Sequence, residues 1–215
     1  MLFKDRLEAG RRLAERLALY KDSHPIILAI PRGGVVVAEP VAEALGGELD
    51  LVIPRKVGLP ANPELAVAAV APDGTVLYNM EVMEALRLSP EDIWPLVEQE
   101  RLEIKRRLKA YRGREDLPPL KDRTVIVVDD GVATGLTTAA AVEYVKKAPP
   151  QRVILAVPVA PPDTAAWLRS KVDELICLYT PEPFYAVGQF YLDFRQITDE
   201  EVKEILSRFQ KRKPS

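Results

Sequence analysis

Three short, unbroken runs of branched apolar residues constrain the fold of this 215-residue chain more than any other feature. They are IILAI at residues 26–30, VIVV at 125–128 and VILAV at 153–157. A strand with one solvated face alternates apolar and polar side chains, whereas a strand of a parallel sheet that is covered on both faces is apolar throughout. Helical patterns lie between the runs, so the sequence predicts an α/β fold with a doubly wound parallel sheet.

The rest of the chain can be divided into elements around these strands, and all of it is assigned to one domain, 1–215. We expect helices at 3–20, 35–47, 89–113, 137–147, 163–172 and 198–209, and strands at 26–30, 49–56, 66–70, 124–130, 152–160 and 174–180. Pro40 is expected to make the start of its helix irregular. Residues 57–66 are expected to form a loop. Thr198 and Glu201 have the spacing of a capping box for the last helix.

Residues 80–118 interrupt the alternation of strands and helices and are expected to form a helical insertion. Ser89 and Pro90 make a typical helix start, with serine at the N-cap and proline in the first turn. Glu103 and Arg107 are spaced for an ion pair across one helical turn. We interpret the insertion as a cover for the core or an oligomer contact, and its charges as a solvated face.

The composition argues against several classes of protein. A net charge of −2 argues against a surface that coats nucleic acid. No apolar run approaches the length of a membrane span, and the first residues read as a charged helix rather than a signal peptide. The single cysteine, Cys177, excludes an internal disulfide and fits a cytoplasmic location. Cys177 is interpreted as a buried small residue, and His24 as a structural or exposed one.

The stretch VIVVDDGVATGLTTA, at residues 125–139, carries the strongest functional signal. Asp129 and Asp130 follow a strand at the edge where open parallel sheets bind ligands. The loop after them supplies free amides at a helix N-terminus, which favours an anion, and Thr134 adds a hydroxyl. Two adjacent acids raise each other's pKa unless hydroxyl donors or a cation compensate. The stretch therefore predicts a phosphate in the loop and a sugar diol at the acids, and its spacing fits neither a Walker A nor a dinucleotide-binding motif.

The same stretch resembles the phosphoribosyl pyrophosphate (PRPP) motif of type I phosphoribosyltransferases, and most of the chain outside residues 80–118 fits that resemblance. The resemblance implies the fold of that family, with a C-terminal hood at residues 178–198. It implies that Asp129 and Asp130 hold the ribose hydroxyls. The residues that would wrap the 5′-phosphate are Gly131, Val132, Ala133, Thr134, Gly135, Thr137 and Thr138.

Two further segments match the family's pyrophosphate loop and active-site lid. AIPRGG lies where these enzymes have a pyrophosphate loop, often with a non-proline cis peptide, and the resemblance implies that Arg32 is its cation and that Gly33 and Gly34 present amides. PRKVGLP resembles the start of the lid, most closely in adenine phosphoribosyltransferases. It makes Arg55 and Lys56 candidates for pyrophosphate contacts, with surface charges as the alternative. Residues 61–70 would form a flexible lid.

The C-terminal segment PEPFYAVGQFYLDF resembles the part of hypoxanthine-type enzymes in which an aromatic ring stacks on the base. Phe184 or Tyr185 would be that ring, with an ordinary core role as the alternative. Asp193 and Asp130 would help to bind the metal. Ala133 stands where hypoxanthine-type enzymes carry an acid, so Glu64 in the lid is the candidate general base.

The resemblance implies displacement of pyrophosphate at the ribose C1 of PRPP by a nitrogenous base or related acceptor, with Mg²⁺ as the cofactor. Glu64, Arg32 and Lys56 are the candidate catalytic residues. The expected partners are these small molecules and a second copy of the chain in a homodimer, without nucleic acid or membrane. Two alternatives stay open: a PRPP- or nucleotide-binding regulatory protein without turnover, and an interaction protein whose insertion serves assembly.

Overall fold

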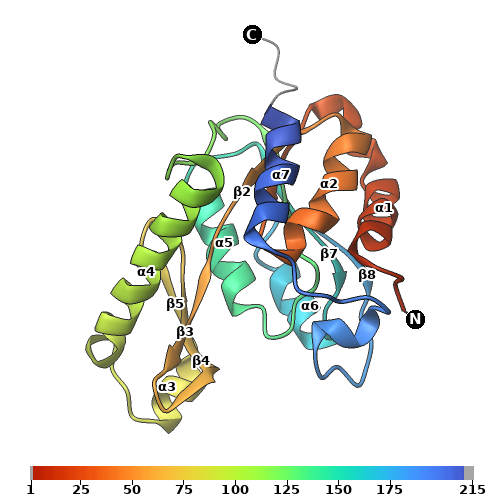
Figure 1. The fold of residues 1–215 in the computed structure, drawn as a ribbon. Helices are drawn as coiled ribbons and strands as arrows, with labels where there is room; N and C mark the ends of the chain where they lie inside the picture. Colours follow the sequence, from red (N-terminus) through yellow and green to blue (C-terminus); the bar gives the residue numbers. More distant parts are fainter. Residues whose placement is uncertain (1, 211–215) are drawn as a thin grey trace.

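The computed structural model describes residues 2–210, and a parallel sheet of five strands forms its centre (Figure 1). The strands, in chain order, are β1 (Ile26–Ala29), β2 (Glu48–Leu51), β6 (Thr124–Val128), β7 (Arg152–Val159) and β8 (Glu174–Tyr179). Their spatial order is β2-β1-β6-β7-β8, with all pairs parallel. The chain moves outward to one side after β1 and to the other side after β6. A topological switch point therefore lies between β1 and β6, where such sheets bind ligands.

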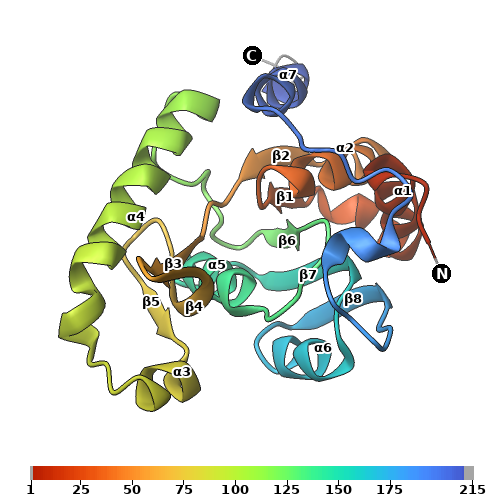
Figure 2. The ribbon, with the colours of Figure 1, turned by 60° about the horizontal axis from the view of Figure 1, so that its bottom comes forward.

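Helices cover both faces of this sheet (Figure 2). They are α1 (Arg6–Arg16), α2 (Gly33–Leu45), α5 (Leu136–Lys146), α6 (Pro162–Arg169) and α7 (Asp199–Gln210). Alternate residues of each central strand face opposite sides: Ile27 and Ile126 pack with α1, α2 and α7. Leu28 and Val127 pack with α5 and α6. The predicted doubly wound α/β fold is confirmed, and burial on both faces explains why these strands are apolar throughout.

A second, antiparallel sheet contradicts two of the sequence-based expectations. It consists of β3 (Arg55–Leu59), β4 (Asn62–Val70) and β5 (Val76–Tyr78), in that order. The strand expected at 49–56 is confirmed only in part, because β2 ends at Leu51 and the chain enters the other sheet after Pro54, which has no N–H to continue the ladder. The strand expected at 66–70 is confirmed as the end of β4, whereas the loop expected at 57–66 is wrong. Buried Val57 anchors β3, and a register shift at Gly58 absorbs the irregular pattern.

The insertion is helical, as expected, and contains two helices. They are α3 (Met80–Ala85) and α4 (Pro90–Arg112). Ser89 and Asp92 form a capping box at the start of α4, and Arg107 donates to Glu103 at 2.7 Å. The buried face of α4 includes Ile104 and packs beside β3 and β4. Figure 1 shows α4 and the antiparallel sheet together as a lobe at one side of the central sheet.

Several smaller expectations can be compared with the structure. Pro40 lies inside α2 without making its start irregular, since the helix is continuous from Gly33. The first helix is shorter than expected and gives way to a 3₁₀ helix, η1 (Ala18–Ser23). The Thr198–Glu201 capping box is confirmed, with both hydrogen bonds present.

The expectations for His24 and Cys177 can also be compared with the structure. His24 is exposed. Cys177 is a free thiol that is only partly buried, and burial raises its pKa to about 11. The hood contains a second 3₁₀ helix, η2 (Val187–Phe190). No helix within residues 2–210 is long and apolar enough to cross a membrane.

Candidate functional site

The register of the central sheet brings two loops together at the switch point. Ala29 at the end of β1 pairs with Val128 at the end of β6. The loop at 30–34 and the acids Asp129 and Asp130 therefore leave the same edge of the sheet side by side. The amide of Ile30 extends this contact by donating to the Val128 carbonyl at 2.9 Å. Two segments that are far apart in the sequence thus form one site.

The first loop fits tightly against the acids. The Pro31–Arg32 peptide bond is cis, as the family resemblance implied, and α2 begins at Gly33. A Cβ atom at Gly33 would lie 1.8 Å from Asp130 Oδ2, and a Cβ at Gly34 would lie 2.8 Å from the Val128 carbonyl oxygen. Only glycine fits at position 33 without displacing the carboxylate.

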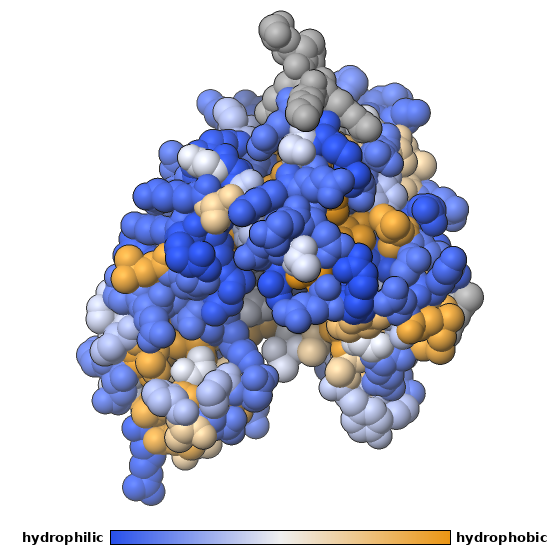
Figure 3. All heavy atoms as spheres, in the orientation of Figure 1, coloured by the Kyte–Doolittle hydropathy of each residue, from blue (hydrophilic) through white to orange (hydrophobic). Residues whose placement is uncertain are grey.

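A cavity of about 460 Å³ opens between the two loops and the end of the hood. Its lining includes Arg32, Gly33, Asp129 and Asp130, so the structure brings these four predicted residues together. The remaining lining residues are Arg6, Ile30, Pro31, Phe194, Arg195, Gln196 and Ile197. The acids therefore face an open space. In Figure 3 the surface is hollowed between the lobe of the insertion and the hood side of the molecule.

Arg6 lines the cavity, although it was not predicted as a site residue. Its side chain is 8% exposed, and its Nε donates to Asp130 Oδ2 at 2.7 Å. Its Nη1 donates to the carbonyl of Arg195 at 2.9 Å, and its guanidinium carbon lies 3.9 Å from the ring centroid of Phe194. The residue begins α1, where a charged amphipathic pattern is typical of a surface helix, so no sequence signal distinguished it from its neighbours.

The two acids differ in their surroundings, although the pKa of each is raised. Burial, followed by the nearby charge of Asp130, raises the pKa of Asp129 well above the usual range. Burial also raises the pKa of Asp130, but the adjacent Arg6 opposes that shift. The backbone N–H of Asp130 donates to Asp129 Oδ1 at 2.8 Å. A ligand with hydroxyl donors or a cation would favour the charged form of Asp129.

The loop after the acids has the features expected of an anion site. Gly131 and Gly135 adopt φ values of +154° and +85°, and a Cβ at Gly131 would lie 2.4 Å from Val187 of the hood. Ala133 and Thr134 are exposed, while Val132 and Thr138 are buried. The loop leads into α5, whose N-cap is Gly135 and which has no side-chain cap. The first amides of α5 and the partly exposed Thr137 are thus available to a phosphate.

The predicted lid residues lie on the antiparallel sheet, away from the lining of the cavity. Lys56 Nζ lies 3.1 Å from Glu64 Oε2, and the Glu64 side chain is 92% exposed. Arg55 Nε donates to Glu100 of α4 at 2.6 Å. These three residues are not brought into contact with the acids in this structure. The ion pair Arg55–Glu100 instead attaches the antiparallel sheet to the insertion.

The hood places its aromatic residues differently from the expectation. Phe184 packs against Phe190 at a ring distance of 4.8 Å, and Tyr185 is 83% exposed. The aromatic ring that lines the cavity is Phe194. Asp193 accepts from the backbone N–H of Arg195 and lines a smaller neighbouring cavity of about 130 Å³. The structure therefore brings neither the predicted ring residues nor Asp193 into the main cavity.

Arg32 has protein partners that the sequence did not indicate. Its Nη1 lies 3.6 Å from Asp199 Oδ1 at the start of α7, and Tyr111 of α4 donates its hydroxyl to the same oxygen at 2.6 Å. Burial raises the pKa of Tyr111 to about 12. The hydrogen bond from Tyr111, opposed by slight burial and helped by the charge of Arg32, lowers the pKa of Asp199. The insertion and α7 therefore meet beside the loop at 30–34.

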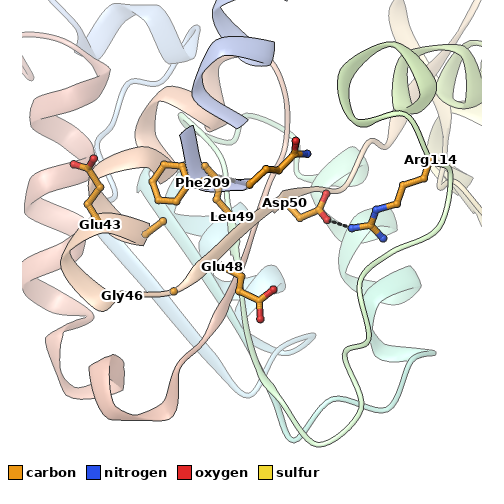
Figure 4. A pocket seen from close by; sticks show the side chains of 10 residues that line it. Glu43, Gly46, Glu48, Leu49, Asp50, Arg114 and Phe209 are labelled. Carbon is orange, nitrogen blue, oxygen red and sulfur yellow. Dashed lines mark hydrogen bonds and ion pairs between the residues drawn. The ribbon is translucent and has the colours of Figure 1, made fainter. Parts of the chain in front are cut away.

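A second cavity of about 460 Å³ lies at the opposite edge of the sheet (Figure 4). It is formed by the end of α2, the start of β2, Arg114 and the end of α7. Asp50 in its lining accepts from Arg114 at 2.5 Å and from Arg112 at 2.6 Å. Because this cavity is at the amino ends of the strands, it is separate from the loops that carry the acids.

Comparison with protein families identifies one domain. A family model described as "Phosphoribosyl transferase domain" matches residues 3–195. Two Mycobacterium tuberculosis proteins, from strains CDC 1551 and H37Rv, are 41% identical to the chain over 207 residues, and both are named "Putative phosphoribosyl transferase". The match covers 96% of this chain and 47% of each relative, so the chain spans about half the length of these relatives.

Comparison with solved structures agrees with the family match. The crystal structure of TT1426 from Thermus thermophilus is 42% identical, with a TM-score of 0.80, and the match covers 97% of this chain and 99% of that one. A hypothetical protein from Neisseria gonorrhoeae, crystallised with bound ppGpp, has 13% identity and a TM-score of 0.51, over 97% of this chain and 96% of that one. That second similarity concerns the fold alone.

Proposed function

The chain belongs to the phosphoribosyl transferase domain family, and we propose that it transfers the phosphoribosyl group of PRPP to a nitrogenous base or related acceptor and releases pyrophosphate. One observation carries the proposal: Arg32 and Gly33 share one open cavity with Asp129 and Asp130 at the switch point of the sheet. A cation and amides for a diphosphate therefore lie beside two acceptors for sugar hydroxyls, which is the order of groups along PRPP. We place this activity in the cytoplasm.

Each part of the site has a role in this reaction. Asp129 and Asp130 accept hydrogen bonds from the ribose hydroxyls, and the amides that begin α5 bind the 5′-phosphate. Charge builds on the departing pyrophosphate in the transition state, and Arg32 stabilises it. Lys56 joins Arg32 when the antiparallel sheet closes over the cavity, which also excludes water. Glu64 travels with Lys56 and is the candidate base toward the acceptor.

The donor set fits a magnesium ion that is held mainly by the substrate. Mg²⁺ binds one or two carboxylates and completes its shell with phosphate oxygens and water. Asp129 supplies a suitable oxygen at the cavity, and no group of three or more potential metal ligands occurs within residues 2–210. Bound there, the ion would neutralise charge on the diphosphate. Asp130 is the weaker candidate ligand because Arg6 already occupies its Oδ2.

The test is a measurement of pyrophosphate release from PRPP and Mg²⁺ in the presence of individual purine and pyrimidine bases. We expect release that depends on one base or a small group of bases. The double variant Asp129→Asn, Asp130→Asn is the inactive control. Tight PRPP binding without release for any base would instead support a regulatory PRPP-binding protein, and absence of PRPP binding would contradict both functions.

A further inference from the structure

A buried guanidinium connects the sugar acids to the hood, although its residue lies in neither. Arg6 donates through Nε to Asp130 Oδ2 and through Nη1 to the carbonyl of Arg195. The two acceptors belong to the end of β6 and to the hood, which are separated by more than sixty residues. A single planar side chain holds both, because the fork geometry of guanidinium presents several donors at fixed angles.

Aromatic contacts fix the same side chain from the hood side. The guanidinium carbon of Arg6 is 3.9 Å from the centroid of Phe194 and 6.0 Å from that of Tyr191. The two rings lie 5.1 Å apart. Tyr191 also donates its hydroxyl to the backbone carbonyl of Asp130 at 2.6 Å. The hood arm, which we define as residues 191–197, therefore contacts Asp130 both directly and through Arg6.

Backbone hydrogen bonds also attach the hood arm to the start of the chain. The amides of Leu192 and Asp193 donate to the carbonyls of Phe3 and Lys4, at 2.8 and 2.9 Å. The arm then runs past α1 toward α7 (Figure 2). Leu192 is 72% exposed, and Phe194 is 37% exposed at the wall of the cavity. Residues 3, 4 and 6 therefore hold the arm from the start of the chain. The ion pair between Arg195 and Glu201 attaches it to α7, and the hydroxyl of Tyr191 attaches it to the end of β6.

We propose that Arg6 is a positioning residue that holds the sugar acid Asp130 and the hood arm in place together. The arm then closes the cavity only when Asp130 is in the orientation that binds the sugar. This inference rests on the proposed function, since it assigns a sugar to Asp130. Gly33 restricts the same carboxylate from the other side, because its Cα leaves no room for Asp130 Oδ2 to move toward α2. The carboxylate is thus held between Gly33 and Arg6, and the arm is held by the other donor of Arg6.

The first experiment needs no ligand. Amide hydrogen exchange is compared for the wild type, Arg6→Gln, Arg6→Lys, Phe194→Leu and the control Arg11→Gln. Arg11 lies on the same helix, is exposed, and is not part of the lining of the cavity. We expect exchange in residues 191–197 to accelerate about 10-fold in Arg6→Gln, with residues 125–128 unchanged. Equal exchange in the wild type and Arg6→Gln would overturn the proposal whatever the protein binds.

The second experiment measures affinity for ribose 5-phosphate and, separately, for pyrophosphate. We expect Arg6→Gln to bind ribose 5-phosphate about 10-fold more weakly and pyrophosphate within about twofold of the wild type. A global structural defect would weaken both. Arg6→Lys should fail to restore sugar binding, because an ammonium cannot reach both acceptors while it is stacked on Phe194. Full rescue by lysine would reduce Arg6 to a counter-charge and overturn the coupling.

Phe194→Leu keeps the proposal testable if Arg6→Gln does not fold, since it leaves the ion pair intact. We expect faster exchange in the hood arm and roughly threefold weaker binding of ribose 5-phosphate, as loss of a cation–π contact implies. Unchanged values for both would overturn the proposal. If the wild type binds neither ligand, the proposed function fails, while the exchange experiment still decides whether Arg6 seats the arm.

Discussion

The edge of the central sheet at Asp129 and the antiparallel sheet at Lys56 both carry candidate site residues, but the protein holds them in different ways. At the edge, the ion pair between Arg6 and Asp130 is 8% and 15% exposed. On the antiparallel sheet, the ion pair between Lys56 and Glu64 is 39% and 92% exposed. A buried pair is fixed by the packing around it, whereas an exposed pair contributes little to stability.

This difference matches the two tasks that the proposed reaction requires. The sugar and its phosphate need a preformed site, because displacement at C1 depends on their orientation. The residues that cover the leaving group must admit substrate and release product, so exposed and weakly paired side chains suit them. Loss of a group from the edge should therefore change both binding and stability, whereas loss of an exposed group from the antiparallel sheet should change activity alone.

The largest effect is expected from Gly33→Ala, which should disturb the fixed position of Asp130 at the edge of the central sheet. The new Cβ would meet Asp130 Oδ2 at 1.8 Å, so either α2 or the carboxylate must move. Overpacking of this kind costs about 1–3 kcal/mol of folding stability. Because the displaced carboxylate would no longer accept from the sugar, ribose 5-phosphate should bind roughly 100-fold more weakly, as measured by calorimetry. Gly113→Ala is the control for a loss of stability away from the cavity, since its φ of +76° strains alanine while no atom lies within 4 Å of its Cβ. Binding within threefold of the wild type in Gly33→Ala would contradict the fit described for this loop.

The next largest effects are expected from substitution of Asp129 or Asp130, and the two substitutions should differ in their effect on stability. Asp129→Asn and Asp130→Asn should each weaken PRPP binding by about 10- to 100-fold, since each removes a charged acceptor. Their stabilities should move in opposite directions. A raised pKa means that the folded protein loses stability as pH rises from the ordinary value through the raised one. Asp129→Asn removes that loss and should unfold at a higher temperature at pH 7.

The pKa of Asp130 is raised as well, which by itself would favour asparagine, but Arg6 opposes that shift and would be left buried without its charged partner. Because an unpaired buried charge costs more, Asp130→Asn should unfold at a lower temperature. Melting of both variants at pH 5 and pH 8, without ligand, checks this contrast. The stabilisation by Asp129→Asn should be greater at pH 8. Parallel shifts for the two acids would show that they are held alike.

On the antiparallel sheet, Glu64→Gln should change turnover without changing stability. If Glu64 is the base, its loss should lower turnover by about 100-fold or more, with PRPP affinity within about twofold of the wild type. Unfolding by urea should be unchanged, because the side chain is 92% exposed. Steady-state kinetics with the identified acceptor measures the first effect, and wild-type kinetics would remove Glu64 from the mechanism.

The smallest effect is expected from Tyr111→Phe, at the contact between α4 and α7. Loss of the hydrogen bond to Asp199 should cost about 1 kcal/mol. Because the folded protein raises the pKa of Tyr111 to about 12, its contribution should be complete below pH 10 and decline as pH rises toward 12. Urea unfolding of both proteins at pH 8 and pH 11 measures this. A difference that stayed constant or grew with pH would contradict the assigned environment.

The sequence predicted the central sheet well because burial on both faces leaves an unmistakable pattern. The run at 125–128 had to be a strand covered on two sides, and the acids after it had to lie at the edge of the sheet. The antiparallel sheet was not predicted, since residues 57–66 contain Gly58, Pro60 and Pro63 and resemble a loop. Their strand conformation depends on tertiary contacts, such as the burial of Val57 against the insertion and core.

The residues of the candidate site likewise fall into a group that was predicted and a group that was not. Arg32, Gly33, Asp129 and Asp130 were predicted together, and the structure places all four at one cavity. Arg6 and Phe194 were not, because their roles arise from contacts across the ends of the chain. A charged residue on an amphipathic helix and an aromatic residue in a hood carry no local signal of a shared cavity. Long-range contacts of this kind are what a single sequence does not reveal.

The whole antiparallel sheet and both helices of the insertion lie within one connection, from the end of β2 to the start of β6. Neither loop of the cavity is part of that connection, since one follows β1 and the other follows β6. Val57 and Val67 of that connection nevertheless belong to the same hydrophobic core as Ile126 of β6. A change in the length or packing of the connection should therefore be transmitted through this shared core to the strands that carry the two loops.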